Sequence, residues 1–231
     1  MRSARHRRHS ALLVSTRGSR LLVDCGADWR GRIDRIHPHA ILVTHAHPDH
    51  ADGLKGGSTC PVYAAHAAWN VMRTWPLDVC SELPLDTPLE IGGFIVECRA
   101  VHHSVNAPAV GFRISAADRC LLYVPDVAAL IDPERTLRDV DLYIGDGSTL
   151  TRALLRSRGR VLTGHAALAT QLEWCKTAGI SRAVFTHCGS QLVRMSPARA
   201  DATVSALGRL HDVDARLAYD NLVLRVRNVT R

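Results

Sequence analysis

The sequence lacks long apolar runs and paired cysteines, and each absence excludes a class of protein. No apolar run in the 231 residues approaches the roughly 20 that a helix needs to cross a bilayer, so we expect no membrane partner. The seven cysteines are scattered, odd in number and without a C-x-x-C pair, which argues against a disulfide framework and a zinc finger. Residues 11–14 are too short an apolar stretch for the core of a signal peptide. We therefore expect a cytoplasmic protein with reduced thiols.

Lysine is almost absent as well. Lys55 and Lys176 stand among 29 basic residues, so arginine carries nearly all of the positive charge. Against 22 acidic residues this gives a formal net charge of +7, which favours anionic partners such as phosphate esters or nucleic acid. A basic stretch either attracts a phosphorylated substrate or is a solvated tail, and it contains Arg2, Arg5, His6, Arg7, Arg8 and His9. With 46% apolar residues and no visible linker, residues 1–231 are expected to form a single domain.

The most informative stretch begins with an apolar run at residues 41–43 and continues into a cluster of polar residues. The run predicts a short buried strand, because branched and aliphatic residues follow one another without a polar interruption. Pro48 blocks any continuing helix or strand ladder, so the polar residues are expected on a loop at the end of the strand. His45 and His47 are two positions apart and therefore project to one side of an extended backbone.

Asp49 and His50 follow directly and must diverge from each other, which suits a second cation beside the first. Neutral imidazole and carboxylate groups are typical ligands of zinc and similar divalent metals. The plain alternative is a polar surface loop with accidental histidines. That alternative is disfavoured because such loops rarely follow a core strand with a donor at nearly every position.

The pattern His45-x-His47-x-Asp49-His50 resembles the signature of the metallo-β-lactamase superfamily. In the iron-binding flavoprotein branch of that superfamily a glutamate normally replaces the second histidine, so His47 indicates the hydrolytic branch. The resemblance implies an α/β (α+β) fold of four layers, an αββα sandwich in which two mixed β-sheets are flanked by helices. It also implies that metals lie at one edge of the sandwich, where the loops at the strand ends converge.

Two later strand ends extend the resemblance. A strand expected at residues 94–101 leads to a histidine pair, of which His103 matches the family's third histidine. Strand alternation turns His102 to the opposite face and leaves it as the alternative. A further buried strand ends at Asp126, which matches the aspartate that bridges both metals in the superfamily. Asp146 repeats the strand-to-acid pattern, but the resemblance gives it no metal, so we take it as a supporting or structural residue.

The last part of the chain resembles the phosphodiesterase branch, which includes ribonuclease Z, the tRNA 3′-processing enzyme, and the cyclic-phosphate phosphodiesterase of phosphonate breakdown. The features are a Gly-His at His165, a helix expected over residues 166–178, and a Thr-His at His187 that ends a strand. In that branch the Thr-His histidine completes the second metal site, and the Gly-His histidine lies beside the scissile phosphate. The resemblance therefore implies His187 as a ligand and His165 as a catalytic residue.

The implied centre holds two divalent cations. The resemblance assigns His45, His47 and His103 to one cation, Asp49, His50 and His187 to the other, and Asp126 to the bridge between them. Two cations about 3.5–4 Å apart lower the pKa of a shared water toward neutrality. Asp49 and His165 are the residues expected to act in catalysis. Because all seven ligands offer nitrogen or oxygen, zinc is the expected metal, with manganese, iron or nickel as alternatives.

Both ends of the chain carry a strand–turn–strand pattern. The first joins residues 11–14 to residues 20–24 and ends at Asp24, which resembles the superfamily aspartate that supports the metal loop. Its alternative role is that of an ordinary turn residue. The second predicts a closing hairpin from residues 215–218 and 222–226.

These features predict a metal-dependent hydrolase, with a small anionic phosphodiester as the expected substrate. A thioester, lactone or lactam hydrolase with the same centre is one alternative. A ribonuclease Z-type endoribonuclease is another, but that family carries a long Gly- and Pro-rich arm that grips tRNA, and no such insertion is visible here. Nucleic acid is therefore an open but not a favoured partner, and a homodimer is also open. A binding module without catalysis is disfavoured by the complete ligand set.

Overall fold

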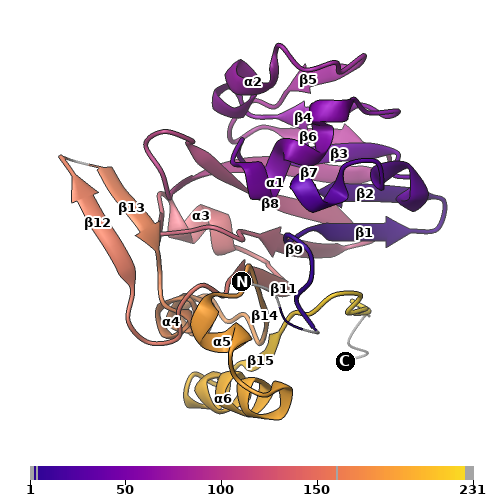
Figure 1. The fold of residues 1–231 in the computed structure, drawn as a ribbon. Coiled ribbons are helices and arrows are strands. Elements are labelled where there is room, and N and C mark those ends of the chain that lie inside the picture. The colour runs from indigo at the N-terminus through magenta and orange to yellow at the C-terminus, as the bar shows by residue number, and fades with distance from the viewer. Residues whose placement is uncertain (1–2, 4, 160, 227–231) are drawn as a thin grey trace.

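Two β-sheets face each other, and helices cover their outer surfaces (Figure 1). The computed structural model describes residues 3, 5–159 and 161–226, so Arg2 of the basic stretch lies outside the described residues. Within these residues the first sheet has five strands and the second has eight. Both sheets are mixed, as predicted, because each contains antiparallel and parallel neighbours.

The strands of the first sheet follow chain order in space: β1 (Leu12–Thr16), β2 (Ser19–Val23), β3 (Ala40–Val43), β4 (Val62–Ala64) and β5 (Cys80–Glu82). The second sheet has the order β10 (Ala129–Leu130), β7 (Phe94–His102), β8 (Ala109–Ala116), β9 (Arg119–Tyr123), β11 (Leu142–Asp146), β14 (Arg182–Thr186) and β15 (Asp214–Leu217), with β6 (Pro88–Ile91) paired to β7. A separate antiparallel ribbon consists of β12 (Leu154–Arg158) and β13 (Val161–His165), and it projects from the body in Figure 1.

The helices form the two outer layers. They are α1 (Pro48–Ala51), α2 (His66–Met72), α3 (Pro133–Leu137), α4 (Leu168–Thr177), α5 (Ser190–Val193) and α6 (Pro197–Leu210), with 3₁₀ turns η1 (Ala27–Trp29), η2 (Ile33–Ile36) and η3 (Asp52–Gly56). In the described part of the chain, no helix has the length and hydropathy of a membrane span.

The residues of β3 show how the sequence produces these layers. Leu42 is buried between the two sheets, in one core with Phe94 and Phe112 of the second sheet. Ile41 and Val43 are buried on the other side of the first sheet, beneath the helices. Neighbouring residues of a strand point to opposite faces, so a strand covered on both sides has an unbroken apolar sequence. The cores therefore confirm the predicted four-layer arrangement.

The predicted closing hairpin is wrong. Residues 214–217 form β15, but residues 222–226 form no strand. Their alternate apolar side chains, Leu222, Leu224 and Val226, instead pack against the core between the sheets. The alternation reflects one buried face, but no neighbouring strand supplies the backbone hydrogen bonds that define a β-strand.

Candidate metal centre

The loop after β3 is held in place by Asp24, at the end of β2. The carboxylate of Asp24 accepts hydrogen bonds from the amide of Thr44 at 2.8 Å and from its hydroxyl at 2.9 and 3.0 Å. It also accepts one from Nδ1 of His50 at 2.8 Å. Asp24 has a φ of +60°, a conformation that aspartate tolerates better than most residues. The prediction that Asp24 supports the loop is confirmed by these contacts.

The nearby glycine of the Asp-Cys-Gly sequence has a steric role. A Cβ atom at Gly26 would collide with the backbone of Asp49, so only glycine lets the β2 end and the ligand loop approach this closely. In α1 Pro48 takes the first helical position, which suits its fixed φ. Asp49 and His50 therefore lie on a short helical turn, and the prediction that Pro48 prevents a helix and leaves them on a loop is wrong.

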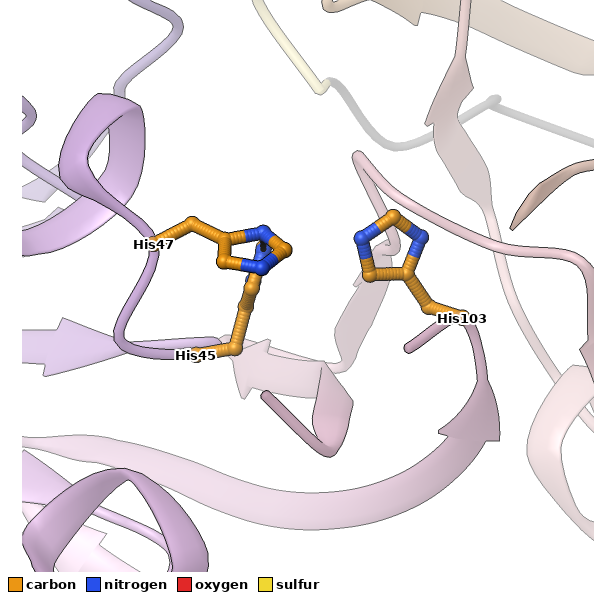
Figure 2. A group of neighbouring side chains, drawn as sticks. All are labelled: His45, His47 and His103. Atoms are coloured by element: carbon orange, nitrogen blue, oxygen red, sulfur yellow. Dashed lines mark hydrogen bonds between the residues drawn. The ribbon is translucent and has the colours of Figure 1, made fainter. Parts of the chain in front are cut away.

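Figure 2 shows three imidazoles that converge on one point, two from this loop and one from the end of β7. The ring centroids of His45 and His47 are 4.5 Å apart, and that of His103 lies 5.1 Å from His45. One ligand atom from each of the three residues lies within 4.8 Å of the others. Nδ1 of His103 donates to the carbonyl of Gly164 at 3.1 Å, which leaves Nε2 free to bind a metal.

A second group of ligand atoms consists of Asp49, His50 and His187, again within 4.8 Å of one another. Nε2 of His187 lies 3.2 Å from Asp49 Oδ2. Since Nδ1 of His50 donates to Asp24, its Nε2 faces the group. His187 has a φ of +50°, and its amide donates to the hydroxyl of Ser10 at 2.9 Å, so the chain before β1 fixes this strand end.

Asp126 lies between the two groups. Its Oδ2 is 2.7 Å from His50 Nε2 and 3.8 Å from His45 Nε2, and its Oδ1 is 3.3 Å from His187 Nδ1. His50 Nε2 is ion-paired with Asp126 Oδ2 but makes no hydrogen bond of good geometry, and Asp126 Oδ1 also has no hydrogen-bond partner among the described residues. Buried polar atoms are almost always hydrogen-bonded, so these two atoms suit a site that binds a cation. The donors and their unpaired atoms therefore fit divalent metal ions.

Burial and charge set the ionisation of these groups. Burial holds the pKa of the imidazoles of His45 and His103 below the ordinary value, so both are neutral and suited to bind a metal. Burial opposes the charged form of His50, but the carboxylates of Asp24 and Asp126 outweigh it and raise its pKa. Burial would likewise raise the pKa of Asp126, but the His187 and His50 rings hold it well below its usual range. Asp126 is thus an anion at any physiological pH.

His165 lies at the end of β13, beside this group, and is oriented by Asp146. Its Nδ1 is 2.7 Å from Asp146 Oδ2 and 3.3 Å from Asp126 Oδ1. Burial lowers the pKa of His165, but the hydrogen bond to Asp146 outweighs this effect and the net shift is upward. Ser148, which the sequence analysis did not single out, contacts Nδ1 of both His165 and His187. The only sequence feature that could have pointed to Ser148 is its position two residues after Asp146.

A cavity of about 870 Å³ opens beside the metal centre. Residues of both strands of the β12–β13 ribbon line it, together with Arg152, Ala153 and residues 104–106. The predicted site residues that line it are His47, His103 and His165. The described residues of the basic N-terminal stretch do not line it: Arg5 pairs with Asp201 at 2.9 Å, and Arg8 lies over the Trp29 ring.

Residues 19–188 match the β-lactamase superfamily domain, which covers more than half of the chain and includes all the predicted ligands. The chain belongs to this superfamily. A ribonuclease Z of Bradyrhizobium sp. (strain ORS 278) is 29% identical over 197 residues, 71% of this chain and 60% of the relative. The match with this chain thus spans about 60% of the length of that curated relative.

Solved structures share the fold of this superfamily member. Zn²⁺-bound PqqB from Methylobacterium extorquens has a TM-score of 0.73 at 22% identity, over 96% of this chain and 89% of the other. A diphosphatase from the PhnP family has a TM-score of 0.64 at 20% identity, over 94% and 83%. These likenesses confirm the metallo-β-lactamase fold. Together with the grouped ligand atoms, the superfamily membership supports a metal-dependent hydrolase.

Proposed function

We propose that this protein is a phosphodiesterase in which two divalent cations, most simply zinc, activate water against a small phosphodiester. His45, His47 and His103 would hold one cation and Asp49, His50 and His187 the other, with Asp126 between them. A pair of cations in such a site activates water as a nucleophile and neutralises charge on phosphate oxygens. The rings of His50 and His103 would be held rigidly, since their Nδ1 atoms donate to the Asp24 carboxylate and the Gly164 carbonyl.

One observation carries the choice of a phosphodiester over other substrates: His165 lines the cavity and lies beside Asp126 of the metal centre. Every hydrogen-bond contact of its ring among the described residues involves Nδ1, which leaves Nε2 for a substrate. Asp146 stabilises the protonated ring, so His165 can donate a proton to the leaving alkoxide or a hydrogen bond to the phosphoryl oxygens. Asp49 would serve as a ligand and as an acceptor for the proton of the attacking water.

The comparisons support the same choice. The curated relative is a ribonuclease Z, which acts on RNA, and a solved neighbour is a diphosphatase, so both act at phosphorus. The precursor tRNA activity is the second candidate, favoured by that 29% identical relative. We place a small substrate first because the cavity volume of about 870 Å³ lies within the range of about 300–1,000 Å³ typical of small-molecule sites.

The test is a substrate panel on metal-reconstituted protein, with bis-p-nitrophenyl phosphate, S-lactoylglutathione, a homoserine lactone and a precursor tRNA. We expect the phosphodiester to have the highest kcat/KM, and the His165→Ala and Asp126→Ala variants to lose at least a hundredfold of it. Faster turnover of the thioester or lactone would refute phosphodiester specificity. Efficient cleavage of the tRNA would overturn the preference for a small substrate, and full activity in Asp126→Ala would refute the dinuclear mechanism.

A further inference from the structure

We propose that the β12–β13 ribbon is a recognition arm whose Arg156 binds a second phosphate of the substrate, so that the preferred substrate is a nucleotide-sized molecule with two phosphate groups. This inference rests on the proposed phosphodiesterase function and adds the substrate class. The ribbon belongs to neither main sheet and projects from the body of the protein (Figure 1). Its residues line the cavity together with His47, His103 and His165.

The register of the ribbon puts Arg156 on the same face as His165. His165 pairs with Leu154, and Thr163 pairs with Arg156. Paired residues of an antiparallel ribbon project to the same side, and so do residues two positions apart. Arg156 therefore lies diagonally across the ribbon from His165, about 7–8 Å away along the same face. Two phosphate groups of one nucleotide-sized molecule can thus contact both side chains.

The ribbon is anchored to the metal centre at its base. The amide of Gly164 donates to the carbonyl of His103 at 2.7 Å, and Nδ1 of His103 donates back to Gly164 at 3.1 Å. The amide of Ala166 donates to the carbonyl of Val127 at 2.6 Å, next to Asp126. Further out, the hydroxyl of Thr163 donates to the carbonyl of Arg156 at 3.1 Å. These bonds fix the spacing between His165 and Arg156.

The cavity wall has the chemistry of an anion subsite. Arg152 and Arg156 both line it, and neither guanidinium has a carboxylate partner among the described residues. No acidic residue occurs in the described lining. The planar guanidinium of arginine matches a phosphate with two parallel hydrogen bonds, and an unpaired one is available to do so. Arg156 is assigned the second phosphate because the register places it on the face of His165, and Arg152 adds positive charge at the same wall.

The remaining lining limits the size of the ligand. Val105, Leu154 and Leu155 are exposed aliphatic side chains at the cavity, which suit the sugar and base of one nucleotide. The described lining contains no aromatic residue. Proteins that bind single-stranded nucleic acid commonly use aromatic side chains as stacking platforms along the strand. The wall therefore fits a mononucleotide or dinucleotide with two phosphates better than a polynucleotide.

Binding measurements test the arm without depending on turnover. Isothermal titration of metal-reconstituted protein would compare thymidine 3′,5′-bisphosphate with thymidine 5′-monophosphate. We expect the bisphosphate to bind about tenfold more tightly to the wild type, as a charge-assisted pair provides. Arg156→Ala should remove most of this preference, and Arg156→Lys should keep part of it. Arg199→Ala, an exposed arginine on α6 outside the cavity, is the matched control and should keep all of it.

A kinetic comparison gives the second readout. The dinucleotides pTpT and TpT differ only by a terminal phosphate, so their KM ratio measures the second-phosphate subsite. Arg156→Ala should bring the two KM values together. If Arg156→Ala leaves both the Kd ratio of the two nucleotides and the KM ratio of the two dinucleotides unchanged, Arg156 does not bind the second phosphate and the proposal is refuted. Failure of the wild type to hydrolyse bis-p-nitrophenyl phosphate would instead refute the phosphodiesterase proposal, while a bisphosphate preference lost in Arg156→Ala would still support the anion subsite.

Discussion

His103 and Gly164 exchange two hydrogen bonds: the Gly164 amide donates to the His103 carbonyl at 2.7 Å, and His103 Nδ1 donates to the Gly164 carbonyl at 3.1 Å. This exchange joins one proposed metal ligand to the ribbon and to the next residue, His165. Gly164 has a φ of +109°, and a Cβ atom there would collide with the carbonyl of Leu154. The positions of His103, a proposed metal ligand, and of His165, the proposed catalytic histidine, thus depend on one glycine.

We expect Gly164→Ala to lower kcat/KM by at least tenfold, because the added Cβ must displace β12 or β13 and with it the His103 ring. Metal content by elemental analysis should fall in the same variant. The matched control is Gly18→Ala, in the turn between β1 and β2, where φ is +94° but nothing lies near an added Cβ. In that variant the free energy of unfolding should fall by about 1–2 kcal/mol because the turn is strained, while kcat/KM should stay unchanged. Equal activity in both variants would contradict the coupling.

Asp126→Asn should reduce bound metal and lower kcat by about a thousandfold or more. The amide keeps the shape of the side chain but removes the negative charge and one acceptor, so both cations lose their shared ligand. Asp118→Asn is the control, since Asp118 is an exposed residue of the β8–β9 turn with a φ of +60°, where asparagine is equally suited. Full metal content in Asp126→Asn would show that the other residues suffice to hold the cations.

Asp146 should act through His165 rather than on the substrate. Asp146→Asn weakens the 2.7 Å hydrogen bond that orients the ring and stabilises its charged form, so we expect a lower kcat with little change in KM. The double variant with His165→Ala should be no slower than His165→Ala alone, because the residue that Asp146 positions is already gone. The pH–rate profile of the single variant Asp146→Asn supplies the independent readout. Asp146 raises the pKa of His165, so the limb of the profile assigned to His165 should shift to lower pH in this variant. Additive losses in the double variant would assign Asp146 a separate role.

The sequence correctly placed the expected loop ligands close together, because they lie within six consecutive positions after a buried strand. His45, His47 and His50 are neighbours in the chain, although Asp24 of the adjacent strand end fixes their loop. His103, Asp126 and His187 lie on distant strands, and only the resemblance placed them beside the loop. The contact of His165 with Asp146 was not predicted, since it depends on how the ribbon returns to the second sheet.

The ribbon itself was missed for a different reason. Residues 154–157 line a cavity and are exposed, so they do not show the alternation of apolar and polar residues that marks a half-buried strand. The opposite error occurred at residues 222–226, where alternation was present but no neighbouring strand was available. Periodicity reports burial, whereas a strand also needs a backbone partner.

Metal removal should destabilise the fold. Without cations the Asp126 carboxylate and the histidine rings lie in a buried cluster with unpaired polar atoms, which is costly. Thermal unfolding after dialysis against EDTA should give a lower Tm, and Zn²⁺ should restore the Tm in a concentration-dependent way. At a free Zn²⁺ concentration a hundredfold above Kd, the free energy of unfolding should rise by about 2.7 kcal/mol. Asp126→Asn should show a smaller Zn²⁺ response. A Tm independent of Zn²⁺ in the wild type would argue against metal binding by the folded state.

The cysteines should differ widely in reactivity, although all seven are free thiols. Cys80 is exposed, whereas burial raises the pKa of Cys98, Cys175 and Cys188 to about 12. At pH 8 a thiol reagent should therefore modify Cys80 rapidly and these three only after unfolding, and Cys80→Ser should lose the rapid phase. Because the unfolded chain releases these thiol protons near pH 9 and the folded chain retains them to about pH 12, the free energy of unfolding should fall as the pH rises through that window. Modification of Cys98 or Cys175 in native Cys80→Ser as fast as that of Cys80 in the wild type would contradict their burial.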